Sequence, residues 1–249
     1  MTVPPSRLGW PSQLWLVRHA ESIGNLAERA AREAGAERLD LSVRDPDVSL
    51  SDTGRSQAQA LGGWLARLAE PPELVLASPY ARATSTAEIA LRAGGLDVPV
   101  ERDERLRERD LGQFDGLTFA GIRALMPTES DRWAHLGKFY YRPPGGEAWA
   151  DVCLRARSVL QTLRLEYPDR RILLVSHQAV IMCFRFVLEN LDEHEVLGVS
   201  SHDPLANCGI TAYEAKGDRL ALRTYNEVAH VVADEAPVTT EPDVSARVV

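Results

Sequence analysis

Two histidines and two arginines occupy similar positions in the sequence, each shortly after a run of apolar residues that is typical of a buried strand. These residues are Arg18, His19, Arg82 and His177. Arginine forks bind phosphate oxygens in pairs and stay charged, and a neutral imidazole is a nucleophile that can form a covalent intermediate. Each residue alone has an ordinary structural explanation. Their shared position favours phosphoryl transfer.

The apolar runs that precede these residues alternate with amphipathic segments. Strands are predicted at 14–17, 74–77, 98–101 and 171–175, and a terminal hairpin at 210–213 and 220–225. Apolar residues at helical spacing follow 58–68 and 152–163, and Ser78-Pro79 is typical of a helix start. This alternation predicts an α/β fold with a mainly parallel sheet, and such sheets bind ligands beyond the carboxyl ends of their strands.

Composition narrows the class of protein. The 249 residues include 28 basic and 36 acidic side chains, a net charge of −8, which argues against nonspecific nucleic-acid binding. The three cysteines form no CxxC pair, so neither a disulfide framework nor a structural zinc site is expected. No apolar run reaches the roughly 18 residues that span a bilayer, and residues 1–11 lack a signal-peptide pattern. We therefore expect a cytoplasmic protein with no membrane partner.

Motifs for other chemistries are absent from the sequence. It contains no GxxxxGK[ST] loop, no GxGxxG and no HExxH. These absences argue against nucleotide triphosphates, dinucleotide cofactors and a catalytic zinc as partners in the reaction.

Six blocks, in order, resemble the signature of the histidine phosphatase superfamily, the phosphoglycerate-mutase-like fold. They are LVRHAES at 16–22, LSDTGRSQA at 50–58, ASPYARAT at 77–84, LRERDLGQFDG at 106–116, PGGE at 144–147 and VSH at 175–177. Any one block is weak evidence, whereas six in order are strong. The resemblance covers residues 14–225 and implies a three-layer α/β/α sandwich with a mainly parallel central sheet.

The resemblance implies a role for each matched residue. His19 is expected to be the nucleophile that becomes phosphohistidine, with Glu108 as the acid that protonates the leaving oxygen and then activates water. Three side chains are expected to grip the phosphoryl group, and a fourth to add a phosphate contact. The first three are Arg18, Arg82 and His177, and the fourth is Asn25. The family needs no metal and no cofactor for this chemistry.

Departures from the family pattern concern substrate recognition. Gln178 replaces the glycine that commonly follows the second histidine, and His177-Gln178-Ala179-Val180 resembles the fructose-2,6-bisphosphatase branch. The basic and aromatic stretch at 138–142 stands where that branch carries a similar one. Lys138, Tyr141, Arg142 and Gln178 are therefore candidates to bind a second phosphate or a sugar. The alternative is a surface loop that packs its aromatic side chains, and the sequence favours neither.

The expected function is hydrolysis of a phosphomonoester, with a small phosphorylated metabolite as substrate. Two alternatives remain. One is phosphoglycerate-mutase-type transfer, which is disfavoured because no paired arginines follow the acid loop, the block at 106–116 that carries Glu108. The other is a catalytically silent module that binds phosphorylated ligands. One domain is expected at 13–230, between a flexible arm at 1–12 and a disordered tail at 231–249. The sequence leaves open whether 26–48 is a flap over the site or a solvated helix, and whether the chain forms a homodimer.

Overall fold

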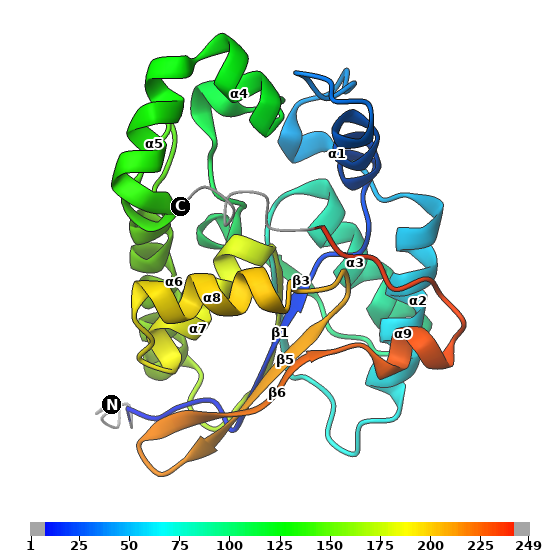
Figure 1. Cartoon of the computed structure of the whole chain (residues 1–249). Helices are drawn as coiled ribbons and strands as arrows, with labels where there is room; N and C mark the ends of the chain where they lie inside the picture. Colours follow the sequence, from blue (N-terminus) through cyan, green and yellow to red (C-terminus); the bar gives the residue numbers. More distant parts are fainter. Residues whose placement is uncertain (1–7, 242–249) are drawn as a thin grey trace.

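The computed structural model describes residues 8–241, and their strands form one six-stranded mixed sheet (Figure 1). The strands are β1 (Gln13–Arg18), β2 (Leu74–Ala77), β3 (Val100–Arg102), β4 (Arg171–Ser176), β5 (Ile210–Lys216) and β6 (Arg219–Glu227). Their order across the sheet is β3-β2-β4-β1-β5-β6. The first four strands are parallel to one another, β5 is antiparallel to β1, and β6 is antiparallel to β5. The predicted strands, including the terminal hairpin, are confirmed.

Helices cover both faces of this sheet (Figure 1). They are α1 (Ile23–Glu33), α2 (Asp52–Ala66), α3 (Ala81–Ala93), α4 (Phe119–Leu125), α5 (Pro127–Tyr140), α6 (Trp149–Glu166), α7 (Gln178–Leu188), α8 (Glu193–His202) and α9 (Ala229–Ala233). The short 3-10 turns are η1 (Asp45–Asp47), η2 (Glu104–Leu106) and η3 (Gly112–Phe114). Helices α2, α3 and α9 pack on one face and α6, α7 and α8 on the other, so the three-layer α/β/α sandwich is confirmed.

Alternate residues of β1 explain why both faces are covered. Leu14 and Leu16 pack into the core beneath α6 and α7, whereas Trp15 and Val17 pack into the core beneath α2 and α3. Successive side chains of a strand point to opposite faces, so a strand that is apolar throughout must be buried on both sides. Since β1 also pairs in parallel with β4, His19 lies just beyond its carboxyl end, beside the end of β4.

The predicted helix start at Ser78-Pro79 is wrong. Helix α3 begins at Ala81, with Tyr80 as an N-cap residue that makes no side-chain cap bond. The Ser78 hydroxyl lies within 2.8 Å of His177 Nε2 and accepts a bond from the Tyr80 N–H at 3.3 Å. Ser78 therefore serves the neighbouring strand end rather than the helix. By contrast, Ser51 caps α2, and its hydroxyl accepts from the Gly54 N–H at 2.9 Å.

A cap lies beyond the carboxyl ends of the parallel strands, formed by α1, α4, α5 and the segment 36–46 (Figure 1). The segment and the start of α4 are hydrogen-bonded to each other: Leu39 N–H donates to Gly116 O at 2.9 Å, and Thr118 N–H donates to Glu37 O at 3.0 Å. At Gly121, an added Cβ would stand 1.9 Å from Glu37 O. The stretch 26–48 thus starts within α1 and continues as the segment 36–46, which packs against the start of α4 in the cap.

Both ends of the described chain pack against the domain, contrary to expectation. At the N-terminal side the Trp10 indole N–H donates to Asp218 O at 2.6 Å, and the Arg164 guanidinium lies 4.6 Å from the ring centroid. At the C-terminal side α9 is followed by a segment that crosses back to the site (Figure 1). Residues 1–7 and 242–249, which complete the predicted arm and tail, lie outside the described residues.

The C-terminal segment, residues 237–241, is held by side chains from distant parts of the chain. Gln57 Nε2 donates to Pro237 O at 2.7 Å and to Thr239 Oγ1 at 2.9 Å, and the Asn207 N–H donates to Thr239 O at 2.9 Å. The prediction of disorder from residue 231 is therefore wrong through residue 241. These partners lie far away in sequence, so a local composition of Pro, Thr and Glu carries no sign of them.

Two further observations concern the described residues as a whole. No helix within residues 8–241 combines the length and apolar character that crossing a bilayer requires. All three cysteines are buried and form no disulfide.

Candidate active site

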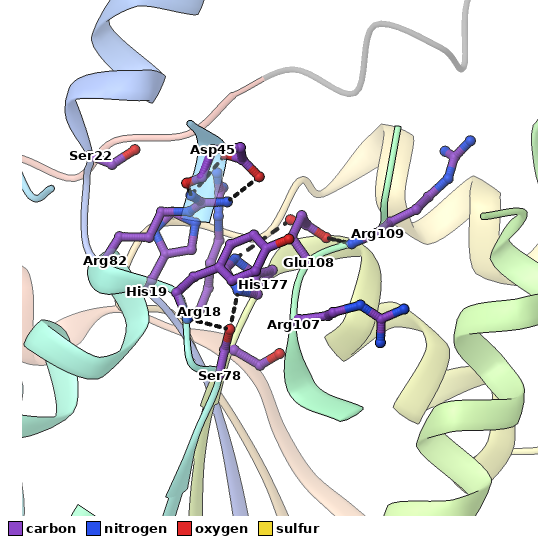
Figure 2. Close-up of polar contacts among 12 residues, drawn as sticks. Arg18, His19, Ser22, Asp45, Ser78, Arg82, Arg107, Glu108, Arg109 and His177 are labelled. Carbon is purple, nitrogen blue, oxygen red and sulfur yellow. Dashed lines mark hydrogen bonds and ion pairs between the residues drawn. The ribbon is translucent and has the colours of Figure 1, made fainter. Parts of the chain in front are cut away.

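The ends of three neighbouring parallel strands bring the predicted residues together (Figure 2). Arg18 at the end of β1 pairs in register with Ser176 of β4, and β4 in turn pairs with β2, which ends at Ala77. His19 and His177 follow these ends with ring centroids 5.1 Å apart, and Arg82 projects from the first turn of α3. Residues almost 160 positions apart thus share one edge of the sheet because the strands run in parallel.

The backbone around His19 is fixed on every side. The His19 N–H donates to Ser176 O at 2.8 Å, the His19 O accepts from Asn207 Nδ2 at 3.0 Å, and the next N–H, of Ala20, donates to Thr86 Oγ1 at 3.0 Å. The ring Nδ1 lies 2.8 Å from Ala20 O. A carbonyl can only accept, so Nδ1 carries the proton and Nε2 presents its lone pair.

His19 is held in the neutral form. Burial lowers the pKa of the His19 imidazole well below its ordinary value, and the positive charges of Arg82 and Arg18 lower it further. A neutral ring with its proton on Nδ1 has its nucleophilic nitrogen, Nε2, available at neutral pH. The same cause, burial, lowers the pKa of His177, again with a contribution from Arg82.

His177 is fully buried and is fixed by the residue that follows β2. Its Nε2 lies 2.8 Å from Ser78 Oγ, and its Nδ1 lies 3.7 Å from Glu108 Oε2. The Tyr80 ring stands edge-on to it at 5.3 Å. The Ser78 contact and the Tyr80 ring therefore orient this imidazole, while its Nδ1 has no hydrogen-bond partner among the described residues.

Both arginines are bound by carboxylates that the sequence reasoning missed. Arg18 Nη2 is ion-paired with Glu241, and its Nη1 donates to Leu205 O at 2.5 Å. Arg82 forms a fork with Asp45, with Nη1–Oδ1 and Nη2–Oδ2 distances of 2.9 and 3.3 Å (Figure 2). The two guanidinium groups, each at most 7% exposed, thus each hold a carboxylate oxygen at the positions predicted to bind phosphate. No local motif marks Asp45 or Glu241, so only the packed chain reveals them.

Glu108 faces the histidine pair from the loop between β3 and α4. Burial raises the pKa of its carboxyl above the ordinary value, although the Arg109 N–H donates to Oε1 at 2.8 Å and opposes this shift. Arg107 and Arg109, its neighbours, point away from the histidines (Figure 2). The charge run at 105–110 therefore contributes only its glutamate to the centre of the site.

Glu147, from the fifth block, braces this loop. Its carboxylate pairs with Arg107 at 2.8 Å and with Arg155 at 2.9 Å, and it accepts from the Asp110 N–H at 3.0 Å. Gly112 adopts a positive φ of 53°, and a Cβ there would stand 2.3 Å from Pro144 O. The blocks at 106–116 and 144–147 are thus packed backbone to backbone.

Asn25 lies in the first turn of α1, and its amide completes the helix cap. Its Oδ1 accepts from the Ser22 N–H and hydroxyl, both at 2.9 Å. With Oδ1 used by the cap, the Nδ2 amino group is the part of Asn25 that can donate to a phosphate oxygen.

A cavity of about 870 Å³ opens above these residues. The predicted residues that line it are Arg18, His19, Asn25, Arg82, Glu108, Lys138 and Gln178. The structure does not bring the other two substrate-binding candidates into it. Tyr141 is buried, stacks on Trp133 and donates its hydroxyl to Glu129 at 2.8 Å, while Arg142 is 62% exposed and paired with Asp151. The alternative interpretation, a stretch that packs its aromatics, is right for Tyr141.

Within residues 8–241 no group of three or more His, Cys, Asp and Glu side chains is arranged to hold a metal ion. Among the described residues, the positive charges that act on His19 are those of Arg82 and Arg18.

Comparison with known proteins agrees with this arrangement. Residues 14–228 match the family model of the histidine phosphatase superfamily, branch 1. A bifunctional protein of Mycobacterium tuberculosis is 32% identical over 237 residues; the match covers 92% of this chain, which spans only 59% of that relative. A 2,3-bisphosphoglycerate-dependent phosphoglycerate mutase of Methylobacterium radiotolerans is 31% identical over 188 residues, or 74% of this chain and 82% of the mutase.

A solved structure shows the same fold. The complex of a mycobacterial glucosyl-3-phosphoglycerate phosphatase with inorganic phosphate superimposes with a TM-score of 0.67 at 27% identity, covering 88% of this chain and 99% of that one. The six sequence blocks, the fold and the family match therefore agree.

Proposed function

The chain belongs to branch 1 of the histidine phosphatase superfamily, and from this we propose that it hydrolyses a small phosphomonoester through a phosphohistidine on His19, without a metal ion. Family members and relatives named as phosphatases and mutases support an enzyme of phosphoryl transfer. The observation that carries the proposal is the neutral His19 ring, with Nε2 unblocked, between two buried guanidinium groups and beside an acid of raised pKa.

In the first step the substrate phosphoryl group displaces Glu241 and Asp45 from Arg18 and Arg82. The guanidinium forks then bind its oxygens and neutralise their charge. The His19 Nε2 lone pair forms a bond to phosphorus as the phosphorus–oxygen bond to the leaving group breaks. Glu108 gives its proton to that oxygen, so that an alcohol departs and a carboxylate remains.

In the second step the same groups act, but Glu108 now accepts a proton instead of donating one. The Glu108 carboxylate accepts a proton from water as the water oxygen bonds to phosphorus. The phosphorus–nitrogen bond breaks, its electron pair returns to Nε2, and inorganic phosphate is released. The raised pKa of Glu108 suits both steps, because the group must be protonated in one and able to accept a proton in the other.

The test is direct detection of the intermediate. The wild-type chain is mixed with a ³²P-labelled monoester and quenched, and labelled protein should be stable in base and lost in acid. His19→Ala should lack both label and turnover. His194→Ala is the matched control because this imidazole is 88% exposed and lies outside the site. If wild-type protein forms no acid-labile label with any ester, the proposal fails and the silent-module alternative is favoured.

The mutase relative provides the second candidate function, transfer of the phosphoryl group back to a substrate. The two functions are separated by following 3-phosphoglycerate in the presence of 2,3-bisphosphoglycerate. Isomerisation without release of inorganic phosphate identifies the mutase, whereas stoichiometric phosphate release identifies the phosphatase.

A further inference from the structure

The cavity has an apolar half that the phosphoryl chemistry does not use. Its wall is formed by side chains from three parts of the cap: the segment before η1, the stretch from the end of η3 through α4, and α5. The most prominent are Leu39, Val43, Leu117, Phe119, Ile122 and Trp133. Val43 is 52% exposed and Leu111, at the same rim, is 40% exposed. Large apolar side chains that line a cavity indicate a binding surface.

This wall is held rigidly. The backbone bonds between 36–39 and 116–118 join the first two of these parts. Behind them Phe114, Ile122 and Tyr141 form a small core of their own. The Trp133 ring is held against this core by Tyr141, stacked at 5.6 Å, and by Phe119, edge-on at 5.8 Å. The apolar wall is therefore built before any ligand arrives, and it is continuous with the phosphate end of the same cavity.

The charges in the outer part of the cavity balance. Among its described lining residues, those outside the phosphoryl grip are the cations Arg32, Arg109 and Lys138 and the acids Glu28, Asp110 and Asp115. The Lys138 ammonium, moreover, lies 4.8 Å from the Trp149 ring centroid. A second phosphate brings about two further negative charges and needs an excess of cations, as the first has in Arg18 and Arg82. The outer wall supplies no such excess.

We propose that the substrate carries a single phosphate and that its leaving group is large, uncharged and apolar, seated on the Val43–Trp133 wall. This inference rests on the proposed function and names the substrate class of the same site. The phosphate at the floor fixes one end of the substrate, and the apolar leaving group extends toward the rim. The 870 Å³ volume matches that of sites for drug-sized ligands rather than a phosphate with a few carbons.

The experiment uses primary alkyl phosphates, whose reacting groups are chemically alike. n-Butyl and n-octyl phosphate, both below micellar concentrations, are compared with glycerol 3-phosphate and fructose 1,6-bisphosphate by kcat/KM. A buried methylene contributes about fourfold in affinity, so burial of two of the four extra methylenes predicts a preference for octyl over butyl of about 15-fold. The bisphosphate should be a poorer substrate than the octyl ester.

Variants locate the preference on the wall. Val43→Ser, at an exposed position, and Trp133→Ala should each lower the octyl-to-butyl ratio at least about threefold. Leu136→Ser is the matched control: it lies on the same helix as Trp133, is 46% exposed and does not line the cavity. Its ratio should equal that of the wild type.

The outcomes separate this inference from the function on which it rests. An octyl-to-butyl ratio near one, a preferred bisphosphate, or an equal loss of the ratio in Leu136→Ser overturns the apolar subsite while leaving the phosphatase intact. Failure to release phosphate from every ester refutes the proposed function, and the inference with it.

Discussion

Glu241→Gln should make the protein bind inorganic phosphate more tightly. In the structure the Glu241 carboxylate and Arg18 form an ion pair whose side chains are 7% and 5% exposed. Phosphate can bind the Arg18 fork only after this carboxylate has left. The variant keeps the shape and a hydrogen bond from Arg18 to an uncharged amide oxygen, but it removes the negative charge with which phosphate competes.

The magnitude follows from the kind of bond that is exchanged. A hydrogen bond to a charged group contributes about 1.5–3 kcal/mol, and the Arg18 bond falls from the upper to the lower end of this range when its acceptor loses its charge. The difference, about 1.4 kcal/mol, corresponds to about tenfold tighter binding. The protein without phosphate should lose about the same stability, because Arg18 stays buried with a weaker partner, and saturating phosphate should restore it.

Isothermal titration with inorganic phosphate at pH 7 measures the change in Kd, and thermal unfolding with and without phosphate measures the stability. Glu235→Gln is the control, since it removes an exposed carboxylate from the same part of the chain. An unchanged or weaker phosphate affinity in folded Glu241→Gln would refute the reasoning. Glu241 would then be a residue that positions Arg18 rather than one that competes for it.

Three further predictions concern pH and specificity. Glu108→Gln should lower kcat for alkyl phosphates about 10²–10⁴-fold. It should also abolish the basic limb of the pH–rate profile, because that limb reports loss of the Glu108 proton, whose pKa burial raises above that of an exposed glutamate. Gln178→Ala should raise KM several-fold for every ester, whereas Arg142→Ala, outside the cavity, should change neither KM nor kcat; a selective loss of bisphosphate activity in Arg142→Ala would contradict this placement. His230 is buried, and burial lowers its pKa to about 4, so the unfolded chain takes up the proton first as pH falls below 6.5. Between pH 6.5 and 4 the wild type should therefore lose about 3 kcal/mol of unfolding free energy relative to His230→Leu in denaturant titrations, and parallel pH profiles would refute the assignment.

Much of the candidate active site was predictable from the sequence, because its residues follow the ends of buried strands. Continuous apolar runs such as Leu14–Val17 predict strands that are buried on both faces, and the carboxyl ends of parallel strands lie at the same edge of the sheet. The positions of His19, Arg82 and His177 follow from these two facts. The family motifs then added Glu108 and Asn25, which occur in segments with no periodicity.

Three features of the site depend on tertiary structure and could not be predicted. They are the carboxylates paired with Arg18 and Arg82, the contact of Ser78 with His177, and the ordered C-terminal segment 237–241. Glu241 reaches Arg18 only because Gln57 and Asn207 hold residues 237–239 in place. Such contacts join side chains more than 30 positions apart and leave no period or local composition to detect. Local sequence patterns are thus enough to predict which strand ends meet, because burial and parallel pairing are read from single segments. Packing between distant segments decides which carboxylates lie on Arg18 and Arg82 and which apolar side chains line the cavity.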